Sequence, residues 1–275
     1  MSFRRRGLCA ALGVATAFAV PAARAGLSAA EIAAKAFEVN GGQDSRSRLS
    51  FTFRKADGSE RRLVYTMAWK HYAAGEISDK VIFFSDFPPD DRGKSYMIWV
   101  AADRSRQDDE WMYLPELRMV RKITHDQSHR RKDEDDSFAD SLLAQVNLVP
   151  RNPQLDNNTL AGEDTVKGHA DYLIESAPKT ASPGFPYQKT RRWISKDNFL
   201  TERIDYYNES GDLGLTEKID WQRVGNAWVW RRVTGSRPGS MERTVLDVSD
   251  VKVDSGLGDD LFSARSMRLG KDSLR

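Results

Sequence analysis

The sequence has almost no cysteine: Cys9 is the only one among its 275 residues. Cys9 lies within an N-terminal segment that fits a cleavable export signal, so the working protein would carry no thiol. This excludes disulfides, a thiolate nucleophile and a cysteine metal site. It also excludes a lipid anchor on a cysteine at the cleavage point. Stability must therefore come from an ordinary hydrophobic core.

Long apolar runs are also scarce. The uncharged stretch 8–20 follows the cationic residues Arg4–Arg6, and it is too short to span a bilayer. Ala23-Arg24-Ala25 then fits the small-residue rule for signal peptidase, and no second run of membrane-spanning length follows. We predict that residues 1–25 are a cleaved signal and that a soluble periplasmic protein begins near Gly26. The alternative is an ordinary N-terminal helix.

Neither sign of charge dominates. The sequence has 42 lysines and arginines against 40 acidic residues, and four of the arginines lie in residues 1–25. After cleavage the protein would be slightly acidic. Nucleic-acid-binding domains normally carry a clear positive excess, so we expect no nucleic-acid partner.

Signatures of catalysis and metal binding are lacking. His125 and His129 have the spacing of two helical ligands, but they lie in a hydrophilic stretch without a suitable third ligand. The acidic run 133–136 lacks the ligand spacing and glycine of an EF-hand. No nucleophile elbow and no phosphate-binding glycine loop is present. We predict no enzyme, no catalytic residues, no metal and no cofactor.

Strand-like runs separated by turns make up most of the chain. A short helix begins it, with Ser28 as N-cap, Glu31 completing a capping box and Gly41-Gly42 as the stop. Asp57-Gly58 is typical of a hairpin turn. Short connections predict an antiparallel meander in a single domain, 26–275. The expected strands are 49–55, 60–69, 81–85, 95–101, 110–114, 171–177, 190–195, 200–207, 213–224, 227–234 and 242–251.

The middle of the chain, 118–153, has a different composition. A charge-rich stretch leads into 137–148, where apolar residues recur at helical spacing. We expect a loop followed by a helix that caps the sheet. The shared apolar face of that helix would hold Leu142, Leu143, Val146 and Leu148.

Large apolar side chains alternate along several strands, which places them on one face of each strand. A curved sheet with one such face and few helices could enclose a hydrophobic cavity, as in lipid-binding β proteins. The residues alone also fit a normally packed core, because aromatic stripes usually just pack. The seven tryptophans would also suit a glycan-binding module, although most of them lie within strand patterns rather than on loops.

Two segments resemble a known family. They are WMYLPELRMVRKI at 111–123 and GEDTVKGHADYLIE at 162–175. They are similar to the outer-membrane lipoprotein-sorting proteins, in the branch of the LolA/LolB-like superfamily associated with transporters of the resistance-nodulation-division (RND) type. The resemblance implies a mainly β, α+β fold: one curved antiparallel sheet forming an open half-barrel, with an apolar cavity capped by short helices. No arginine here matches the cargo-gating basic residue of the best-known carriers, so the cargo stays open.

Together these observations predict a periplasmic carrier that binds the acyl chains of a lipoprotein or lipid and moves them across the envelope. Its further partners would be an inner-membrane transporter, an outer-membrane acceptor, or both, and it would be a monomer. One alternative is an envelope sensor or scaffold that binds a protein with the same fold, and another is a secreted hydrolase or glycan binder. The predicted rim or partner residues are Arg118, Arg121 and Lys122. The predicted cavity lining is Leu63, Tyr65, Met67, Trp69, Met97, Trp99, Trp111, Leu213, Leu215, Ile219 and Trp221.

Overall fold

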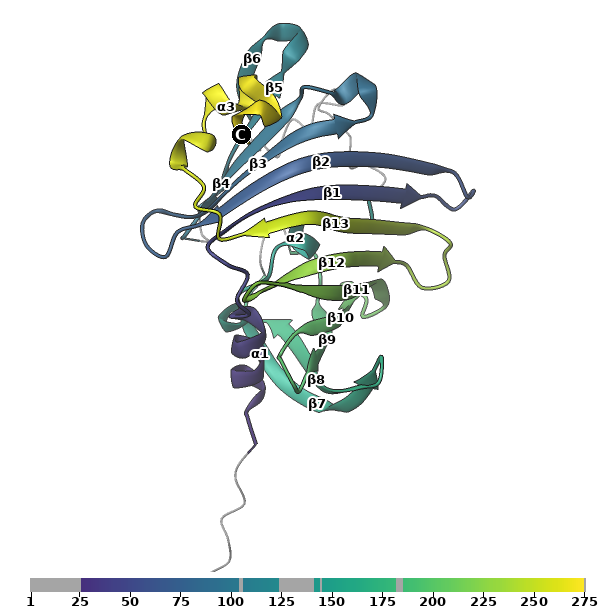
Figure 1. Ribbon diagram of the computed structural model, residues 1–275. Coiled ribbons are helices and arrows are strands. Elements are labelled where there is room, and N and C mark those ends of the chain that lie inside the picture. The colour runs from purple at the N-terminus through teal and green to yellow at the C-terminus, as the bar shows by residue number, and fades with distance from the viewer. Residues whose placement is uncertain (1–25, 104–105, 124–140, 144, 182–184, 275) are drawn as a thin grey trace, which may run out of the picture.

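The computed structural model describes residues 26–103, 106–123, 141–143, 145–181 and 185–274, with 145 and 146 described in their backbone only. Thirteen strands in this described part form one antiparallel sheet, in the order β6-β5-β4-β3-β2-β1-β13-β12-β11-β10-β9-β8-β7 (Figure 1). The first and last strands of the chain therefore pair at the centre of the sheet. The edge strands β6 and β7 do not pair with each other, so the sheet stays open.

Each expected run coincides with a strand, although β1 begins at Asp44 and β3 at Ile77, before the expected 49 and 81. Asp57-Gly58 forms the predicted hairpin turn between β1 and β2, with Gly58 at a φ of 84° and the Lys55 amide donating to the Ser59 carbonyl. The bounds are β1 Asp44–Arg54, β2 Glu60–His71, β3 Ile77–Phe87, β4 Ser95–Ala101, β5 Asp109–Leu114, β6 Met119–Ile123, β7 Asp156–Val166, β8 His169–Pro178, β9 Lys189–Ser195, β10 Thr201–Tyr207, β11 Leu213–Val224, β12 Ala227–Ser236 and β13 Arg243–Val253.

Two of these strands, β6 and β7, were not predicted. Both lie at the sheet edges, where each pairs with one neighbour only, and most of their side chains are exposed. An edge strand exposed on both faces needs no alternation of apolar and polar residues, so the pattern that identifies a strand is missing.

The helices are short. Helix α1, Ala29–Phe37, begins as predicted: the Ser28 amide donates to Glu31 Oε2 at 2.8 Å, and the Glu31 amide donates to Ser28 Oγ at 3.3 Å. Helix α3, Ala264–Leu269, lies in a C-terminal segment for which the sequence suggested no structure. Short 3-10 turns complete the described part, at η1 Pro89–Asp91, η2 Pro115–Leu117, η3 Pro153–Leu155, η4 Asp259–Leu261 and η5 Gly270–Leu274.

The helix expected over 137–148 is reduced to α2, Gln145–Leu148. Residues 137–140 lie outside the described residues, but 141–143 are not helical. Side-chain hydroxyls bind the backbone amides of this segment in place of helical carbonyls. The Leu142 amide donates to Thr244 Oγ1 at 2.8 Å, and the Leu143 amide donates to Ser141 Oγ at 3.1 Å. Such local side-chain bonds compete with helix formation.

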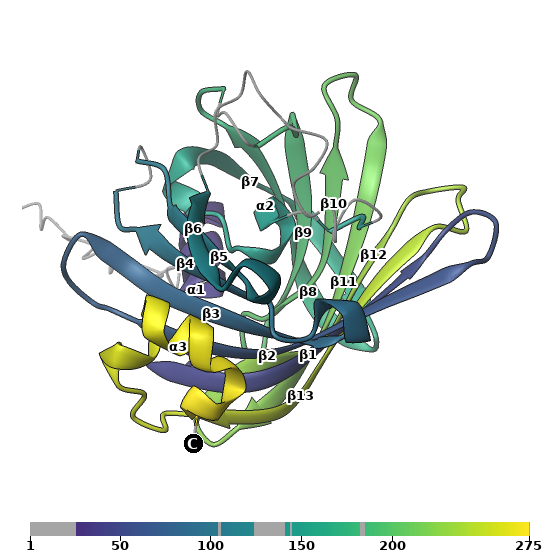
Figure 2. The ribbon, with the colours of Figure 1, turned by 90° about the horizontal axis from the view of Figure 1, so that it is seen from above.

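The sheet curves around α2 and leaves α3 outside (Figure 2). We call the inner surface the concave face and the outer surface, covered by α3, the convex face. The twist and bulges of the long strands give this curvature, and seven of the described strand pairs contain a register shift, such as β1–β13 and β7–β8. The predicted fold class, a mainly β protein with one curved open sheet and short helices, is confirmed.

Candidate binding face

Apolar side chains from strands far apart in the sequence meet on the concave face. We call this group the concave cluster. The β1 and β2 strands contribute aromatic rings in edge contact, such as Phe51 and Tyr65 with centroids 6.3 Å apart. Its buried members are Leu49, Phe51, Phe53, Leu63, Tyr65, Leu143, Tyr206, Leu215, Ile219, Val233 and Leu246, and its partly buried members include Met67, Leu142, Leu148, Tyr187, Trp221 and Trp230.

Six of the eleven residues predicted to line a cavity belong to this concave cluster: Leu63, Tyr65, Met67, Leu215, Ile219 and Trp221. Trp69 follows Met67 on the same face of β2, but its indole donates to Asp79 Oδ1 at 3.0 Å and stacks on His71. Leu213 is half-buried at the beginning of β11, next to a register shift opposite Tyr207.

The other three, Met97, Trp99 and Trp111, lie on the convex face. The register places Met67 opposite Phe83 and Met97 opposite Ile82, one residue along β3 and therefore on the other side. These three residues pack with Phe262 and Met267 of the C-terminal segment, in what we call the convex cluster. The expectation that they share one face with Tyr65 and Met67 is wrong. Alternation within a strand shows which residues share a face, but not which face that is.

The chain itself covers part of the concave face. Leu143 is 1 % exposed and lies directly over Gly235 of β12: a Cβ added to Gly235 would come within 2.9 Å of Leu143 side-chain carbons. Beside it the side-chain amide of Asn147 donates to the Tyr187 hydroxyl at 3.2 Å. The ring centroids of Tyr187 and Tyr206 are 4.6 Å apart. Residues 141–143 and 147–148, which we call the inner segment, therefore occupy space that an apolar ligand would also use.

One acidic residue lies within this apolar surface. Glu217 is fully buried, between Leu215 and Ile219 on the same face of β11, and its Oε2 accepts a hydrogen bond from the Tyr206 hydroxyl at 2.7 Å. Burial raises the pKa of Glu217 to about 8, against the lowering effect of that hydrogen bond. Sequence reasoning missed Glu217, although its position between two apolar neighbours at a spacing of two is itself the signal.

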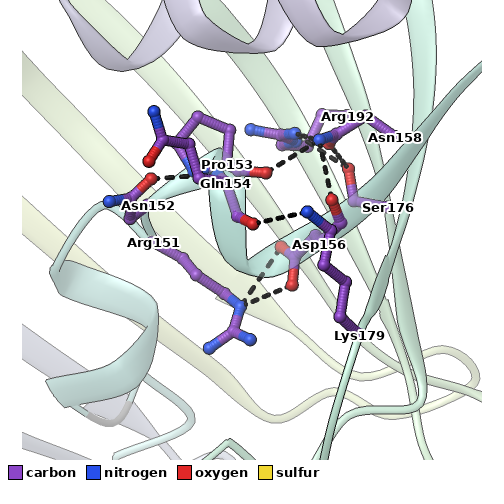
Figure 3. A network of polar contacts seen from close by, with 9 residues as sticks. All are labelled: Arg151, Asn152, Pro153, Gln154, Asp156, Asn158, Ser176, Lys179 and Arg192. Atoms are coloured by element: carbon purple, nitrogen blue, oxygen red, sulfur yellow. Dashed lines mark hydrogen bonds and ion pairs between the residues drawn. The ribbon is translucent and has the colours of Figure 1, made fainter. Parts of the chain in front are cut away.

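A polar network flanks the concave cluster on β7, β8 and β9 (Figure 3). Arg192 donates to Asn158 Oδ1 at 3.1 Å and to Ser176 Oγ at 2.8 Å, and burial lowers the pKa of its guanidinium. Arg151 donates to both carboxylate oxygens of Asp156 at 2.9 and 3.2 Å. These contacts join η3 and β7 to the sheet, so we interpret the network as structural.

A pocket of about 540 Å³ lies elsewhere, between β1 and the C-terminal segment. Its lining includes Arg46, Leu257, Arg265 and Leu269. Arg46 projects from the convex side, opposite Ala68 of the convex cluster, and donates to the Leu274 carbonyl. This pocket therefore belongs to the outer surface of the sheet and not to the predicted concave site.

The predicted rim residues lie on the β5–β6 hairpin. Arg118 ends the η2 turn with a φ of 49°, and Arg121 is exposed on β6. Lys122 pairs with Asp109 at 2.5 Å and lies over the Trp111 ring at 5.5 Å, so it already has partners within the chain.

Two further predictions concern metals and membranes. His125 and His129 lie outside the described residues, and within the described ranges no three His, Cys, Asp or Glu side chains gather as metal ligands do. Within the same ranges no helix has the length and apolar character needed to cross a membrane.

Solved structures share this open, curved antiparallel sheet. A DUF1329 family protein from Desulfovibrio piger has a TM-score of 0.71 at 24% identity, with 87% of this chain and 97% of that chain covered. An outer membrane lipoprotein-sorting protein domain from Vibrio parahaemolyticus has a TM-score of 0.71 at 18% identity, with 87% and 98% covered. A LolA superfamily protein from Nitrosomonas europaea has a TM-score of 0.60 at 20% identity, with 88% and 100% covered.

A protein-family model described as "Uncharacterized protein" matches residues 78–269, which is more than half of the chain. The chain belongs to that family. No curated protein matches the sequence. The predicted resemblance to lipoprotein-sorting proteins of the LolA/LolB-like superfamily is confirmed, and at these identities the solved structures establish the fold.

Proposed function

We propose that this protein is a carrier of the cell envelope that binds the acyl chain of a lipid or lipoprotein on its concave face, without chemistry. The observation that supports this most is the concave cluster: a continuous apolar surface on the inside of an open sheet, covered in part by the inner segment. The names of the structural neighbours point the same way, since lipoprotein sorting requires shelter for an acyl chain.

The energetics suit a carrier. Burial of about a dozen methylenes, at roughly 0.8 kcal/mol each, gives micromolar affinity once the costs of association are subtracted. Displacing the inner segment lowers the affinity further, because the ligand must replace contacts that the chain already makes. Moderate affinity allows release to a membrane acceptor.

We propose further that the carrier acts in the periplasm as a monomer, after cleavage of residues 1–25, between an inner-membrane transporter and an outer-membrane acceptor. The β5–β6 hairpin is the proposed contact surface. It projects beyond the body of the sheet, and Arg118 and Arg121 are exposed on it (Figure 1). Charge on a projecting hairpin suits recognition of an acidic partner surface.

Two tryptophans on opposite faces allow a matched test. Trp221 belongs to the concave cluster and Trp99 to the convex cluster, and both are half-buried. Binding of a fluorescent fatty acid should weaken by about tenfold in Trp221→Ala, because a large contact surface is lost, and should stay unchanged in Trp99→Ala. Native mass spectrometry of the protein purified from periplasm should also detect bound lipid.

Absence of both co-purified lipid and acyl-probe binding would overturn the carrier proposal. The second proposed function, an envelope sensor or scaffold that binds a protein with the same fold, would then be favoured. The observation behind it is that the inner segment already fills part of the concave face.

A further inference from the structure

The buried carboxyl of Glu217 is not explained by packing alone. Its neighbours on the same face of β11 are Leu215 and Ile219, and all three are at most 4 % exposed. Placing an acid in an apolar surface costs free energy that a leucine or methionine at this position would not. A buried polar atom that lacks a hydrogen-bond partner destabilises the fold, so its presence suggests a functional role.

Only one of the two carboxyl oxygens has a partner. Glu217 Oε2 accepts from the Tyr206 hydroxyl at 2.7 Å, whereas Oε1 is buried and has no hydrogen-bond partner among the described residues. Because burial raises the pKa of this group to about 8, the acid is mostly neutral at pH 7. Since Oε2 accepts from Tyr206, a neutral Glu217 would carry its proton on Oε1 and could donate a hydrogen bond from that oxygen.

The neighbouring strand β12 places no side chain beside Glu217. Glu217 pairs directly with Gly235 of β12, which has no side chain, and the space above Gly235 is taken by the apolar Leu143. Leu143 cannot accept a hydrogen bond. If the inner segment moves aside, a ligand group can enter where Leu143 lies and reach the Glu217 side chain.

We propose that Glu217 is a ligand-binding residue that donates a hydrogen bond to the carbonyl oxygen of an acyl ester or amide bound on the concave face. The inference rests on the proposed carrier function and specifies its ligand: an acyl group recognised at its carbonyl, rather than any hydrocarbon. An apolar chain would fill the concave cluster, and the carbonyl would accept a hydrogen bond from the buried Oε1 of Glu217.

A matched pair of probes tests this. Methyl dodecanoate has a carbonyl, and dodecyl methyl ether has a methylene in its place at the same chain length. Displacement of a bound fluorescent fatty acid measures both affinities in the wild-type protein, in Glu217→Met and in Glu217→Gln. Methionine keeps the volume without a donor, whereas glutamine keeps a donor. Circular dichroism checks that both variants fold.

The wild-type protein should bind the ester about three- to tenfold more tightly than the ether, the usual range for one buried hydrogen bond. Glu217→Met should reduce this ratio to about one, and Glu217→Gln should keep most of it. Equal binding of ester and ether by the wild-type protein would overturn the inference while leaving the carrier proposal intact, and so would an unchanged ratio in Glu217→Met. Failure of the wild-type protein to bind either probe would overturn both.

Discussion

The two faces of the sheet are both apolar but are covered in different ways. On the convex face the C-terminal segment is anchored along its length: Asp44 accepts from the amides of Ser255, Gly256 and Leu257, and Lys70 pairs with Asp259 at 2.7 Å. On the concave face, in the described part of the inner segment, the Leu142 amide donates to Thr244 Oγ1 and the Asn147 side chain bonds Tyr187 and Tyr206.

The difference indicates that only one of the two covers is permanent. The convex cluster buries Phe262 and Met267 at 1 % and 0 % exposure. The concave cluster contains a buried acid with an unpaired oxygen beneath the inner segment. Segments with few anchoring bonds open at a lower free energy than the global unfolding of the fold, so we expect the concave cover to detach first.

The largest expected effect is on the convex side. Phe262→Ala should lower the free energy of unfolding by about 3–5 kcal/mol, because the ring is fully buried and its loss leaves a cavity. Urea denaturation measures this. Leu269→Ala is the control from the same segment; Leu269 is 53% exposed, so its loss should have little effect. Similar losses in both variants would show that the segment is not a fixed cover.

Burial of Glu217 should make the stability of the concave side depend on pH. Burial raises the pKa of Glu217 in the fold to about 8, from the ordinary value of 4.5. The folded state thus holds a proton that the unfolded state releases, and stability should fall as pH rises from about 5 to 8, by about 2–4 kcal/mol. The ionisable side chain in direct contact is Tyr206, with Tyr187 beside it, and burial raises the pKa of both above the ordinary value.

Unfolding of Glu217→Gln, measured by urea denaturation at several pH values, isolates this effect. The variant should lose most of the decline between pH 5 and 8. Asp171, on the opposite face of β8, has its pKa raised to about 6 by burial and then by Glu202, so it contributes a smaller decline of the same sign in both proteins. A variant with the same pH profile as the wild type would contradict the assignment.

Anchoring of the convex cover should have the opposite pH sign. Burial by itself would raise the pKa of Asp44, but hydrogen bonds from Leu257 and Ser255 hold it below the ordinary value. Its contribution is therefore present at neutral pH and is lost as pH falls below about 4. Asp44→Ala should cost about 2–3 kcal/mol at pH 7, since several amide donors lose their acceptor, and should cost little in acid. Thermal unfolding of the wild type and of Asp44→Ala, at pH 7 and below pH 4, measures this difference.

The sequence was sufficient for the strands that alternate and for the capping box at Ser28. It was insufficient where residues lack an apolar pattern, as in the edge strand β7, and where a segment's partners are distant in the chain, as with the Leu142 amide and Thr244. The register between neighbouring strands decides which face of each strand lies on the concave side. A shift of one residue along β3 separates Met67 from Met97, and no local pattern contains that information.

For the candidate site, too, alternation within a strand predicts which residues share a face, but not which strands come together. Leu215 and Ile219 could be assigned to one face from alternation alone, and the structure joins them with Tyr65 from the other half of the sheet. Glu217 sits in the same alternating series, but an acid in an apolar stripe is ordinarily read as an interruption of the pattern. Its burial and the hydrogen bond from Tyr206 show that it belongs to the apolar face.

The smallest expected effect on stability distinguishes the two covers most directly. Leu143→Ala and Leu261→Ala remove the same side chain, at 1 % and 6 % exposure, from the concave and the convex cover respectively. A buried leucine typically costs about 2–5 kcal/mol, and Leu261→Ala should fall in that range. Leu143→Ala should cost only about 1–2 kcal/mol, because the loss cannot exceed the free energy needed to detach the inner segment.

Leu143→Ala and Leu261→Ala should also differ in their affinity for a ligand. Leu143→Ala weakens the competitor for the concave face, so affinity for a fluorescent fatty acid should rise by about threefold or more, whereas Leu261→Ala should leave it unchanged. Equal costs in stability together with unchanged binding in both variants would contradict an exchangeable concave cover. Higher affinity in Leu143→Ala alone would show that the inner segment and the acyl chain compete for the space above Gly235, because the substitution removes contacts of the covering segment and leaves the apolar surface of the sheet intact.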